Sequence, residues 1–470
     1  MKAVANTTGP NARPGSAPDG FGQPVEFDDG RSFDPVAVQK STQLWIEQRM
    51  KLKESQFTES APVKIFCGSW NVNGKYLKEG ALSDWLCPAN TEYADANGCP
   101  TSDLYFIGFQ EAVDLTAVNV AMDTETRKRT GQWQEAISEC LSSRGGRYKL
   151  LATKYLVGLI LYAYVKESLV GFVRDVRTSS AAVGIGGFLG NKGGVSIRLT
   201  LFDSAICTIC SHLAAHRENV AGRNADFQNI IEKSVFSVQD STSDAVDSTS
   251  TQSSAGMASP DRKVDPIRRS LRYKTGLSET EDISILDHDV VMWLGDLNYR
   301  IDESIPLEDV FQRIQNGDYQ SLRDTDQLNI ERARGNVFQE FNEGILNFAP
   351  TYKYQPGTDE YDRRPEKKIR CPAWCDRVLW RVGKERSETV NQLTYQRAEL
   401  RPSDHKPISS LFGCSLRKVI AERERAMFEE LLRELDKWEN DSIPRIEVSN
   451  LKIDLGLMHY AVKFCYQIFN

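Results

Sequence analysis

The chain has 470 residues, of which 40% are hydrophobic, so it can bury a large core and hold one large domain with appendages. Its net charge of −7 argues against a general nucleic-acid coat, because binding to duplexes depends on Lys and Arg neutralising phosphates. The longest apolar stretch, 155–165, is shorter than the roughly 20 residues that span a bilayer, and is expected to be a buried strand. The polar start lacks the apolar segment of a secretory signal, which favours a cytoplasmic protein.

The elements expected in chain order indicate a layered α/β enzyme. Residues 1–36 are expected to be a flexible arm and 37–62 a helical lead-in, with a helix between Pro35 and about Lys53. From Val63 onward, strand-like runs alternate with helical stretches and long loops. Strands are expected at 63–67, 104–109, 156–165, 194–201, 206–211 and 290–294.

The remaining segments surround this catalytic region, which is expected to cover 63–413. Residues 237–281 are rich in Ser and Thr and are predicted to be a disordered insertion. A linker helix is expected over 414–445, followed at 446–470 by strands that begin a further β domain.

The ten cysteines are scattered, so reduced thiols are expected. Cys207 and Cys210 form a C-x-x-C, but their surroundings resemble a strand, which would send the two thiols to opposite faces. Core packing is therefore preferred to a zinc site.

Carboxylates and histidines follow the strand-like runs and indicate one catalytic centre. Asp296 and Asn298 come two residues apart, so on a strand-like backbone both would face the same pocket, where they could hold and deprotonate a water. Asp376 is a suitable partner to set the tautomer of His405, which follows Asp404. His212 ends another strand and could contact a transferring phosphoryl group or its leaving oxygen.

Two further strand ends suit a hard cation. Asn71 follows one apolar run and Glu111 another, and together they would make a sparse, open site of the kind that Mg²⁺ prefers. Either residue alone would more often be a structural strand end.

Two loops add groups that could meet a phosphorylated ligand or a membrane. The glycine-rich segment 184–194 offers backbone amides, and Lys192 adds a positive charge, although the segment lacks the pattern of a nucleotide P-loop. Phe188 and Leu189 are apolar at its tip and could enter lipid. The basic and aromatic stretch from Tyr352 to Arg370 could bind an additional phosphate, or could be a solvated basic loop.

Several motifs resemble the inositol polyphosphate 5-phosphatases, in the same order along about 63–412. They are Trp70-Asn71-Val72-Asn73-Gly74, Phe109-Gln110-Glu111, Gly190-Asn191-Lys192-Gly193, Ser211-His212-Leu213, Trp293-Leu294-Gly295-Asp296-Leu297-Asn298, Pro372-Ala373-Trp374-Cys375-Asp376-Arg377 and Ser403-Asp404-His405. The segment 438–444 is similar to the junction with the ASH domain in the type II and Lowe-syndrome subgroup.

The resemblance implies the endonuclease/exonuclease/phosphatase fold, a four-layer α/β sandwich, and Mg²⁺-dependent removal of a 5-phosphate from inositol lipids or soluble inositol phosphates. It assigns Asn191 and Lys192 to the substrate, and Tyr352, Lys353 and Arg370 to its 4-phosphate. The expected partners are inositol phosphates and a phosphoinositide membrane surface, which the protein would meet as a monomer at the cytosolic face. Contact with a Rab-type GTPase would require a complete ASH domain, and no nucleic-acid partner is expected.

Two alternatives stay open at this point. A nuclease of the same superfamily would use the same residue types, and a catalytically inactive phosphoinositide-binding scaffold would need only the binding groups. The acidic net charge and the set Tyr352, Lys353 and Arg370 favour the inositol substrate.

Overall fold

The computed structural model describes residues 35–76, 82–88, 95, 100–113, 119–183, 192–237, 282–384 and 388–442. Its chain forms two compact units, one from Glu54 to Glu424 and one that combines residues before 54 with residues after 424. Some predictions concern residues outside the described ranges. These are nearly all of the N-terminal arm, the insertion after residue 237, the segment 446–470, and Phe188, Leu189 and Asn191.

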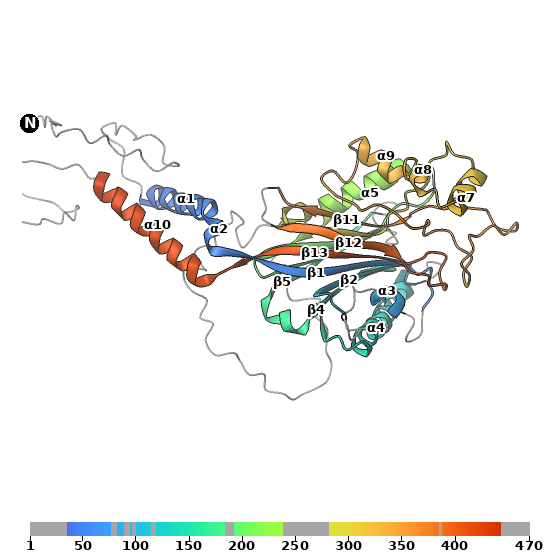
Figure 1. Ribbon diagram of the computed structural model, residues 1–470, viewed down its shortest axis with the longest axis horizontal. Coiled ribbons are helices and arrows are strands. Elements are labelled where there is room, and N and C mark those ends of the chain that lie inside the picture. Colours follow the sequence, from blue (N-terminus) through green and yellow to red (C-terminus); the bar gives the residue numbers. More distant parts are fainter. Residues whose placement is uncertain are drawn as a thin grey trace, which may run out of the picture. The chain divides into compact units, whose positions relative to one another are not determined.

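Two β-sheets form the centre of the larger unit (Figure 1). The first sheet has the order β12 (Thr389–Arg397), β13 (Ile408–Val419), β1 (Thr58–Asn71), β2 (Leu104–Gln110), β4 (Leu159–Lys166) and β3 (Tyr148–Leu156). The second has the order β11 (Asp376–Val382), β10 (Val290–Asp296), β7 (Ser204–His212), β6 (Gly193–Leu201) and β5 (Val173–Ala182). A short pair, β8 (Val235–Phe236) and β9 (Ile283–Ser284), forms a separate two-stranded sheet.

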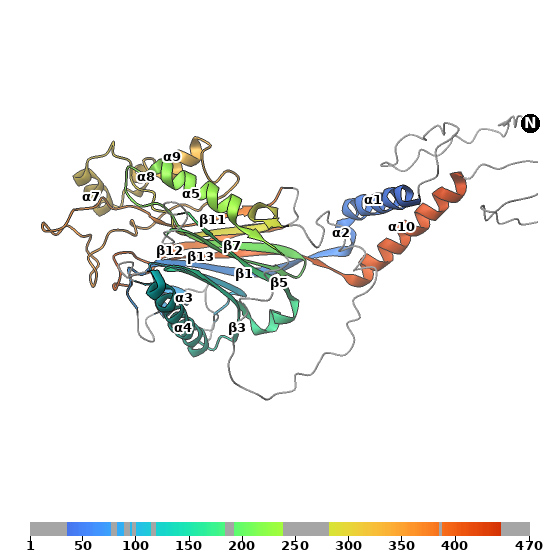
Figure 2. The same cartoon turned by 180° about the vertical axis from the view of Figure 1, so that it is seen from behind.

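Helices cover the outer face of each sheet. On the first sheet these are α3 (Ser83–Leu86) and α4 (Asn119–Ser143), and on the second α5 (Val220–Lys233) and α9 (Gln327–Ala333). The two groups lie on opposite sides of the sheets in both views (Figures 1 and 2). The expected four-layer α/β sandwich is therefore confirmed. The other described elements of this unit include α2 (Glu54–Phe57), η1 (Glu167–Phe172), η4 (Ile285–Asp287), α7 (Leu307–Gln315) and α8 (Tyr319–Arg323).

The main core lies between the two sheets. In β10, Met292 and Leu294 face this inner core, whereas Trp293 packs outward beneath the helices. Because both faces of the strand are covered, its sequence is apolar throughout rather than alternating. Cys207 packs in the outer cluster and Cys210 in the inner one, which confirms that the two thiols point to opposite faces.

Gly108 allows the two sheets to approach each other closely. A Cβ atom at this position of β2 would lie 2.4 Å from Cδ1 of Leu294 and 2.6 Å from Sγ of Cys210, both on the facing sheet. Since real Cβ atoms do not come so near, any larger residue would push β2 away from β7 and β10.

Two expected elements differ from those observed. The apolar run 155–165 is the end of β3, a turn at Gly158 and then β4, because Gly158 adopts a φ of 71° that reverses the chain. The predicted linker helix starts later than 414: β13 continues to Val419, and α10 covers Ala421–Ser442. In that part of β13 buried Cys414 and Leu416 alternate with partly exposed residues, which is the period of a strand.

The sheet also extends beyond the expected catalytic region. Thr58, where β1 begins, pairs with Val419, where β13 ends, so the folded unit is wider than 63–413. The long β1–β13 ribbon thus brings together two segments that are far apart in sequence.

The smaller unit is a helical pair. The predicted helix near Pro35 is confirmed as α1 (Pro35–Leu52), and it lies beside the later turns of α10 in both views (Figures 1 and 2). Trp45 and Met50 of α1 are buried, as is Leu431 of α10. The ammonium of Lys53 lies 3.2 Å from the carboxylate of Glu430. Among the described helices, none combines the length and the apolar character that a membrane span requires.

Candidate active site

Three neighbouring strands place polar side chains in one row at the edge of the second sheet. Asp296 ends β10 and pairs in register with His212, at the end of β7, and with Asp376, at the start of β11. Strands β7 and β10 are parallel, so their carboxyl ends meet at the same edge, where open α/β sheets place ligands. The sequence prediction that these motifs converge is confirmed.

Gly295 is required for this arrangement. It has a φ of +146°, and a Cβ atom there would lie 2.0 Å from the carbonyl oxygen of Ser211. Only glycine fits this contact without moving the backbone. The close approach of β10 to β7 brings Asp296 next to His212.

Asp296 is the centre of the site and is almost fully buried. Its Oδ2 accepts a hydrogen bond of 2.9 Å from Nδ2 of Asn71, and lies 3.3 Å from Nε2 of His212 and 3.9 Å from Nε2 of His405. Its Oδ1 accepts from the backbone N–H of Asn298 at 3.1 Å. Groups from both sheets therefore fix the orientation of this carboxylate.

The neighbouring charges keep Asp296 ionised. Burial opposes its negative charge, but His212, His405 and Lys192 outweigh burial and hold the pKa of this carboxyl well below its usual value. An ionised, oriented and buried carboxylate can accept a hydrogen bond from a water molecule and take up its proton during attack.

His405 and Asp376 form the expected pair. Nδ1 of His405 lies 2.9 Å from Oδ2 of Asp376, which also accepts a 2.7 Å hydrogen bond from Oγ1 of Thr351. Burial opposes a charge on the imidazole, but Asp376, Asp296 and Asp404 outweigh it and raise the pKa of His405 to about 9. The ring is therefore cationic at neutral pH, and its Nε2 faces the centre of the site.

A second positive group lies on the other side of Asp296. The ammonium of Lys192 contacts Nε2 of His212, and the carboxylate of Glu111 lies 3.8 Å from the same nitrogen. Burial lowers the pKa of Lys192, although Asp296 and Glu111 act against this change. The carboxylate of Glu111 is 30% exposed, so it faces an opening rather than the core.

Asn298 differs from the prediction. Strand β10 ends at Asp296 and Asn298 has a φ of +56°, so the two side chains do not share a strand face. Instead, Nδ2 of Asn298 donates to the carbonyl of Leu213 at 3.0 Å, and its Oδ1 accepts from Arg300. The backbone N–H of Asn298, rather than its amide, contacts Asp296.

The basic and aromatic stretch contributes to the site at its beginning. The ring of Tyr352 lies 4.6 Å from that of His405, and the guanidinium of Arg300 lies 4.3 Å from the Tyr352 ring on which it stacks. Lys353 pairs with Asp404 at 3.2 Å. Arg370 is half-buried and forms no hydrogen bond or ion pair with Tyr352 or Lys353 in the described part of the chain.

Sequence reasoning did not assign Thr351 or Arg300, although both lie beside assigned residues. Thr351 orients Asp376, and Arg300 holds Asn298 and covers Tyr352. Their closeness in sequence to Tyr352 and Asn298 was the only available signal, because neither contact follows from spacing along a strand.

The arrangement suits hydrolysis of a phosphate ester. Atoms of Asp296, Asp376 and His405 all lie within 4.8 Å of one another, and the hydrogen bond from His405 to Asp376 accounts for part of this cluster. An ionised carboxylate stands between cationic groups that could stabilise a phosphate, and Glu111 offers oxygen ligands to a hard cation.

Comparison with known proteins agrees with this geometry. Residues 68–411 match the endonuclease/exonuclease/phosphatase family 2. The type II inositol 1,4,5-trisphosphate 5-phosphatase of Mus musculus is 35% identical over 86% of this chain and 35% of its own length. Synaptojanin of Caenorhabditis elegans is 33% identical over 78% of this chain and 29% of its own length.

A solved structure of an inositol polyphosphate 5-phosphatase domain is similar to this chain in fold as well as in sequence. The inositol polyphosphate 5-phosphatase domain of SpSynaptojanin, in complex with inositol (1,4)-bisphosphate and calcium ion, is 31% identical with a TM-score of 0.64. The match covers 87% of this chain and 99% of that one.

The fold and the site define an enzyme of the endonuclease/exonuclease/phosphatase class. Within this class, the chain belongs to the inositol polyphosphate 5-phosphatase family. It spans between 23% and 35% of the length of the curated relatives that it matches.

Proposed function

We propose that the protein removes the 5-phosphate from phosphatidylinositol 4,5-bisphosphate and related inositol lipids or soluble inositol phosphates, in a reaction that depends on Mg²⁺. The observation that carries this proposal is the position of Asp296, an ionised and buried carboxylate between two histidines at a sheet edge. The similarity of the chain to a domain solved with an inositol bisphosphate supports the substrate class.

In the proposed mechanism, a water attacks the 5-phosphorus in line with the departing inositol oxygen. Asp296 holds this water and accepts its proton, while Asn71 keeps the carboxylate in position. The cationic ring of His405 binds a phosphate oxygen, and His212 and Lys192 contact the group from the other side. Because water is the nucleophile in this mechanism, no phosphoenzyme is expected.

Glu111 and Asn71 are the proposed metal ligands, and the geometry fits this role. The carboxylate of Glu111 is partly exposed beside the catalytic groups. Oδ1 of Asn71 accepts from the backbone N–H of Asn73 at 3.0 Å, which leaves its second lone pair for a cation. A bound Mg²⁺ would neutralise charge on the phosphate and on the departing oxygen. The calcium in the solved relative supports a divalent cation of this class.

The residues proposed for the 4-phosphate are Tyr352, Lys353 and Arg370, and Asn191 is proposed to contact the substrate together with Lys192. Tyr352 lies beside His405, so a ligand held there would be next to the reacting phosphate. Lys353 would have to exchange its partner Asp404 for the phosphate, which a flexible side chain with one charged head can do.

A phosphate-release assay tests the function. It compares a 4,5-bisphosphorylated inositol lipid, its soluble head group and DNA, each with and without Mg²⁺. Asp296→Asn should lower turnover by several orders of magnitude, as the loss of a central catalytic group does. Asp289→Asn is a matched control, because Asp289 is also buried and precedes the opposite end of β10, where it accepts from the N–H of Ala205. Hydrolysis of a phosphodiester frees no inorganic phosphate, so the DNA arm is read as strand cleavage. Strand cleavage without phosphate release from either inositol substrate would support the nuclease, and no reaction with any substrate would support the inactive scaffold.

Membrane attachment is a separate part of the proposal. We propose that Phe188 and Leu189 contact lipid at the cytosolic face of a membrane and that the protein acts as a monomer. Vesicles containing the bisphosphorylated lipid should bind the Phe188→Ser, Leu189→Ser double variant less well than the parent protein. Equal binding of the two proteins would contradict this role, and sedimentation would test the oligomeric state.

A further inference from the structure

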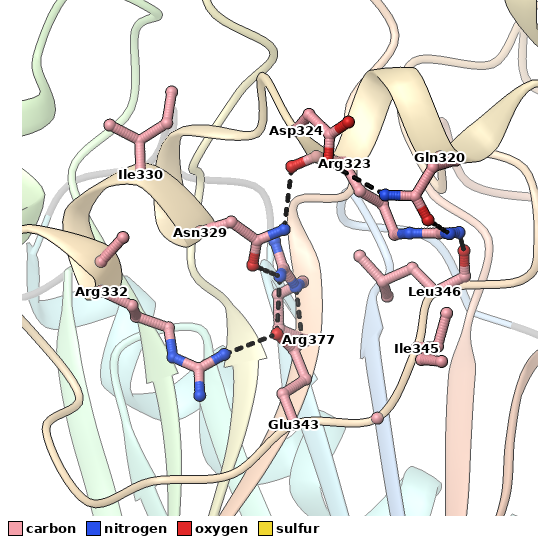
Figure 3. A pocket seen from close by; sticks show the side chains of 12 residues that line it. Gln320, Arg323, Asp324, Asn329, Ile330, Arg332, Glu343, Ile345, Leu346 and Arg377 are labelled. Carbon is pink, nitrogen blue, oxygen red and sulfur yellow. Dashed lines mark hydrogen bonds and ion pairs between the residues drawn. The ribbon is translucent and has the colours of Figure 1, made fainter.

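Arg377 follows Asp376 directly on β11, and its side chain enters the opposite side of the strand. It is fully buried, and its guanidinium reaches two carboxylates, of which Figure 3 draws that of Glu343. Nη1 donates to Oδ1 of Asp326 at 2.8 Å, while Nε and Nη2 donate to the two oxygens of Glu343, each at 2.6 Å. This fork geometry fixes the direction of the arginine as well as its distance from the carboxylates.

The next residue of β11 is held as well. The backbone N–H of Val378 donates at 3.0 Å to the hydroxyl of Tyr395, which in turn lies 3.3 Å from Oε1 of Glu343. Asp326 is the N-cap of α9 and accepts from the backbone N–H of Asn329 at 3.1 Å. The start of β11 is therefore fastened to α9, to the segment around residue 343 and to the other sheet.

A cavity of about 450 Å³ reaches this cluster from the surface (Figure 3). The charged groups that line it are already paired: Arg323 donates to the carbonyl of Leu346 at 2.7 Å, and Arg332 lies 3.5 Å from Glu343. Each charged side chain that lines the cavity thus has a partner among the described residues. The cavity exposes one side of an otherwise buried ionic cluster.

Such a cluster is a poor source of stability. The free energy needed to transfer the charges out of water is about as large as the free energy gained from their attraction. Apolar residues of similar volume would therefore often stabilise a fold equally well. The ionic cluster instead fixes the orientation of the groups that it joins, because each hydrogen bond has a preferred geometry.

The orientation that these hydrogen bonds impose matters at Asp376, the residue next to Arg377. Oδ2 of Asp376 contacts both His405 and Thr351, whereas Oδ1 has no hydrogen-bond partner among the residues that the structure describes. The carboxylate is thus fastened on one oxygen only, and its backbone position decides where His405 points. That position is set by the pairing of β11 with β10, in which Asp376 lies opposite Asp296, and by the contacts of the neighbouring Arg377.

We propose that Arg377 is a positioning residue for catalysis, which fixes the start of β11 through Asp326 and Glu343 and thereby aims Asp376 and His405 at the substrate. The inference rests on the proposed function, since it concerns the phosphate-binding histidine. Arg377 itself touches no reacting atom; it acts through the backbone of its neighbour.

Arg377→Lys tests this role, because lysine keeps the charge but cannot bind two carboxylates through a planar fork. We expect kcat for inositol phosphate hydrolysis to fall roughly 10- to 100-fold, the effect of a small misplacement of a catalytic group. KM should stay within about twofold, because the binding groups outside this strand are unchanged. Each rate is divided by the folded fraction measured by circular dichroism.

Arg381→Lys is the matched control. Arg381 lies on the same strand and the same face, and it pairs with Glu340 at 3.1 Å, but it is further from the site. Its replacement should leave kcat within about twofold of the parent. If Arg377→Lys behaves like this control, or if it changes KM alone, the positioning role is wrong.

Tyr395→Phe is a milder second variant in case Arg377→Lys fails to fold. It removes the hydroxyl that holds Val378 and Glu343 but leaves all charges in place. We expect a smaller loss of kcat in the same direction. Normal kcat in a folded Tyr395→Phe protein would contradict the proposal.

A spectroscopic measurement separates this inference from the proposed function. In protein with isotope-labelled histidine, the proton between His405 and Asp376 should give a downfield imidazole N–H resonance. We expect Arg377→Lys and Tyr395→Phe to shift or broaden this resonance, and Arg381→Lys to leave it unchanged. The spectrum needs no substrate, so it can overturn the positioning role even if the parent protein hydrolyses no inositol phosphate. Absence of activity with a shifted resonance would count only against the proposed function.

Discussion

Replacement of Asp376 by Asn should move the alkaline limb of the pH profile. In the folded protein, burial disfavours a charge on His405, but Asp376 and two further carboxylates raise the pKa of this histidine from 6.5 to about 9. The difference corresponds to about 3 kcal/mol in favour of the imidazolium ion. Asp376 is the largest of these favourable contributions. Asn can still accept the hydrogen bond but carries no charge.

The size of the effect follows from this pKa. At pH 7.5, a histidine with a pKa of about 9 is roughly 97% protonated, whereas one with a pKa of 6.5 is roughly 10% protonated. If the imidazolium binds the phosphate, Asp376→Asn should therefore lower kcat/KM about tenfold at pH 7.5, and less at pH 6. The alkaline limb, near pH 9 in the parent, should move toward pH 6.5.

The ion pair between His405 and Asp376 also makes the stability of the fold depend on pH. Because the pKa of His405 is raised in the folded state, the ion pair contributes its full stability below pH 6.5 and loses it as the pH rises through about 9. Urea unfolding should be measured for the parent protein and for Asp376→Asn between pH 6 and pH 9.5. The difference between their free energies of unfolding should shrink as the pH rises.

The assay is phosphate release measured from pH 5.5 to pH 10 at saturating Mg²⁺. Thr351→Val is the control, since it removes the other donor to Oδ2 of Asp376 while keeping the charge. Its alkaline limb should stay near that of the parent, even if the rate falls. Equal alkaline limbs in the parent and in Asp376→Asn would refute the reasoning that Asp376 keeps His405 charged.

Three further predictions concern other parts of the chain. Gly295→Ala should destabilise the fold by about 3 kcal/mol or more, measured by urea unfolding, because a Cβ atom would lie 2.0 Å from the carbonyl oxygen of Ser211; a smaller loss would show that β10 can move. Burial, aided by Arg198, lowers the pKa of His288 from 6.5 to about 4, so about 3 kcal/mol of stability should be lost as the pH falls through this range. In His288→Gln the free energy of unfolding should fall less as the pH falls. An equal fall in the variant and the parent would contradict this role of His288. Glu111→Gln should raise the Mg²⁺ concentration for half-maximal activity roughly tenfold or more, and an unchanged requirement would exclude Glu111 as a ligand.

The sequence predicts the strand ends well, for a physical reason. Strands buried on both faces are uniformly apolar, so a polar residue directly after such a run marks the edge of the sheet. His212 and Asp296 are examples, and the structure places them 3.3 Å apart. The pairing of Asp376 with His405 was also expected, because a buried imidazole needs a partner for its second nitrogen.

The sequence predicts less where the chain leaves regular structure. Asn298 was expected on a strand face, but its φ of +56° turns the side chain toward Leu213. Spacing rules assume a regular backbone and fail at such a turn. Arg377 shows a second limit: its partners Asp326 and Glu343 are 51 and 34 residues away in sequence, and no local pattern indicates that they meet.

The β1–β13 ribbon has a consequence for how such a unit can be built into longer chains. Its catalytic end carries Asn71, while the chain enters the sheet at Thr58 and leaves it at Val419, which are paired at the other end. Strand β1 has 14 residues, so these entry and exit points lie roughly 40 Å from the catalytic end. Additional domains joined at either point would share one attachment site remote from the substrate opening. A unit of this kind can therefore be joined to different neighbours without any change at the edge that carries Asp296.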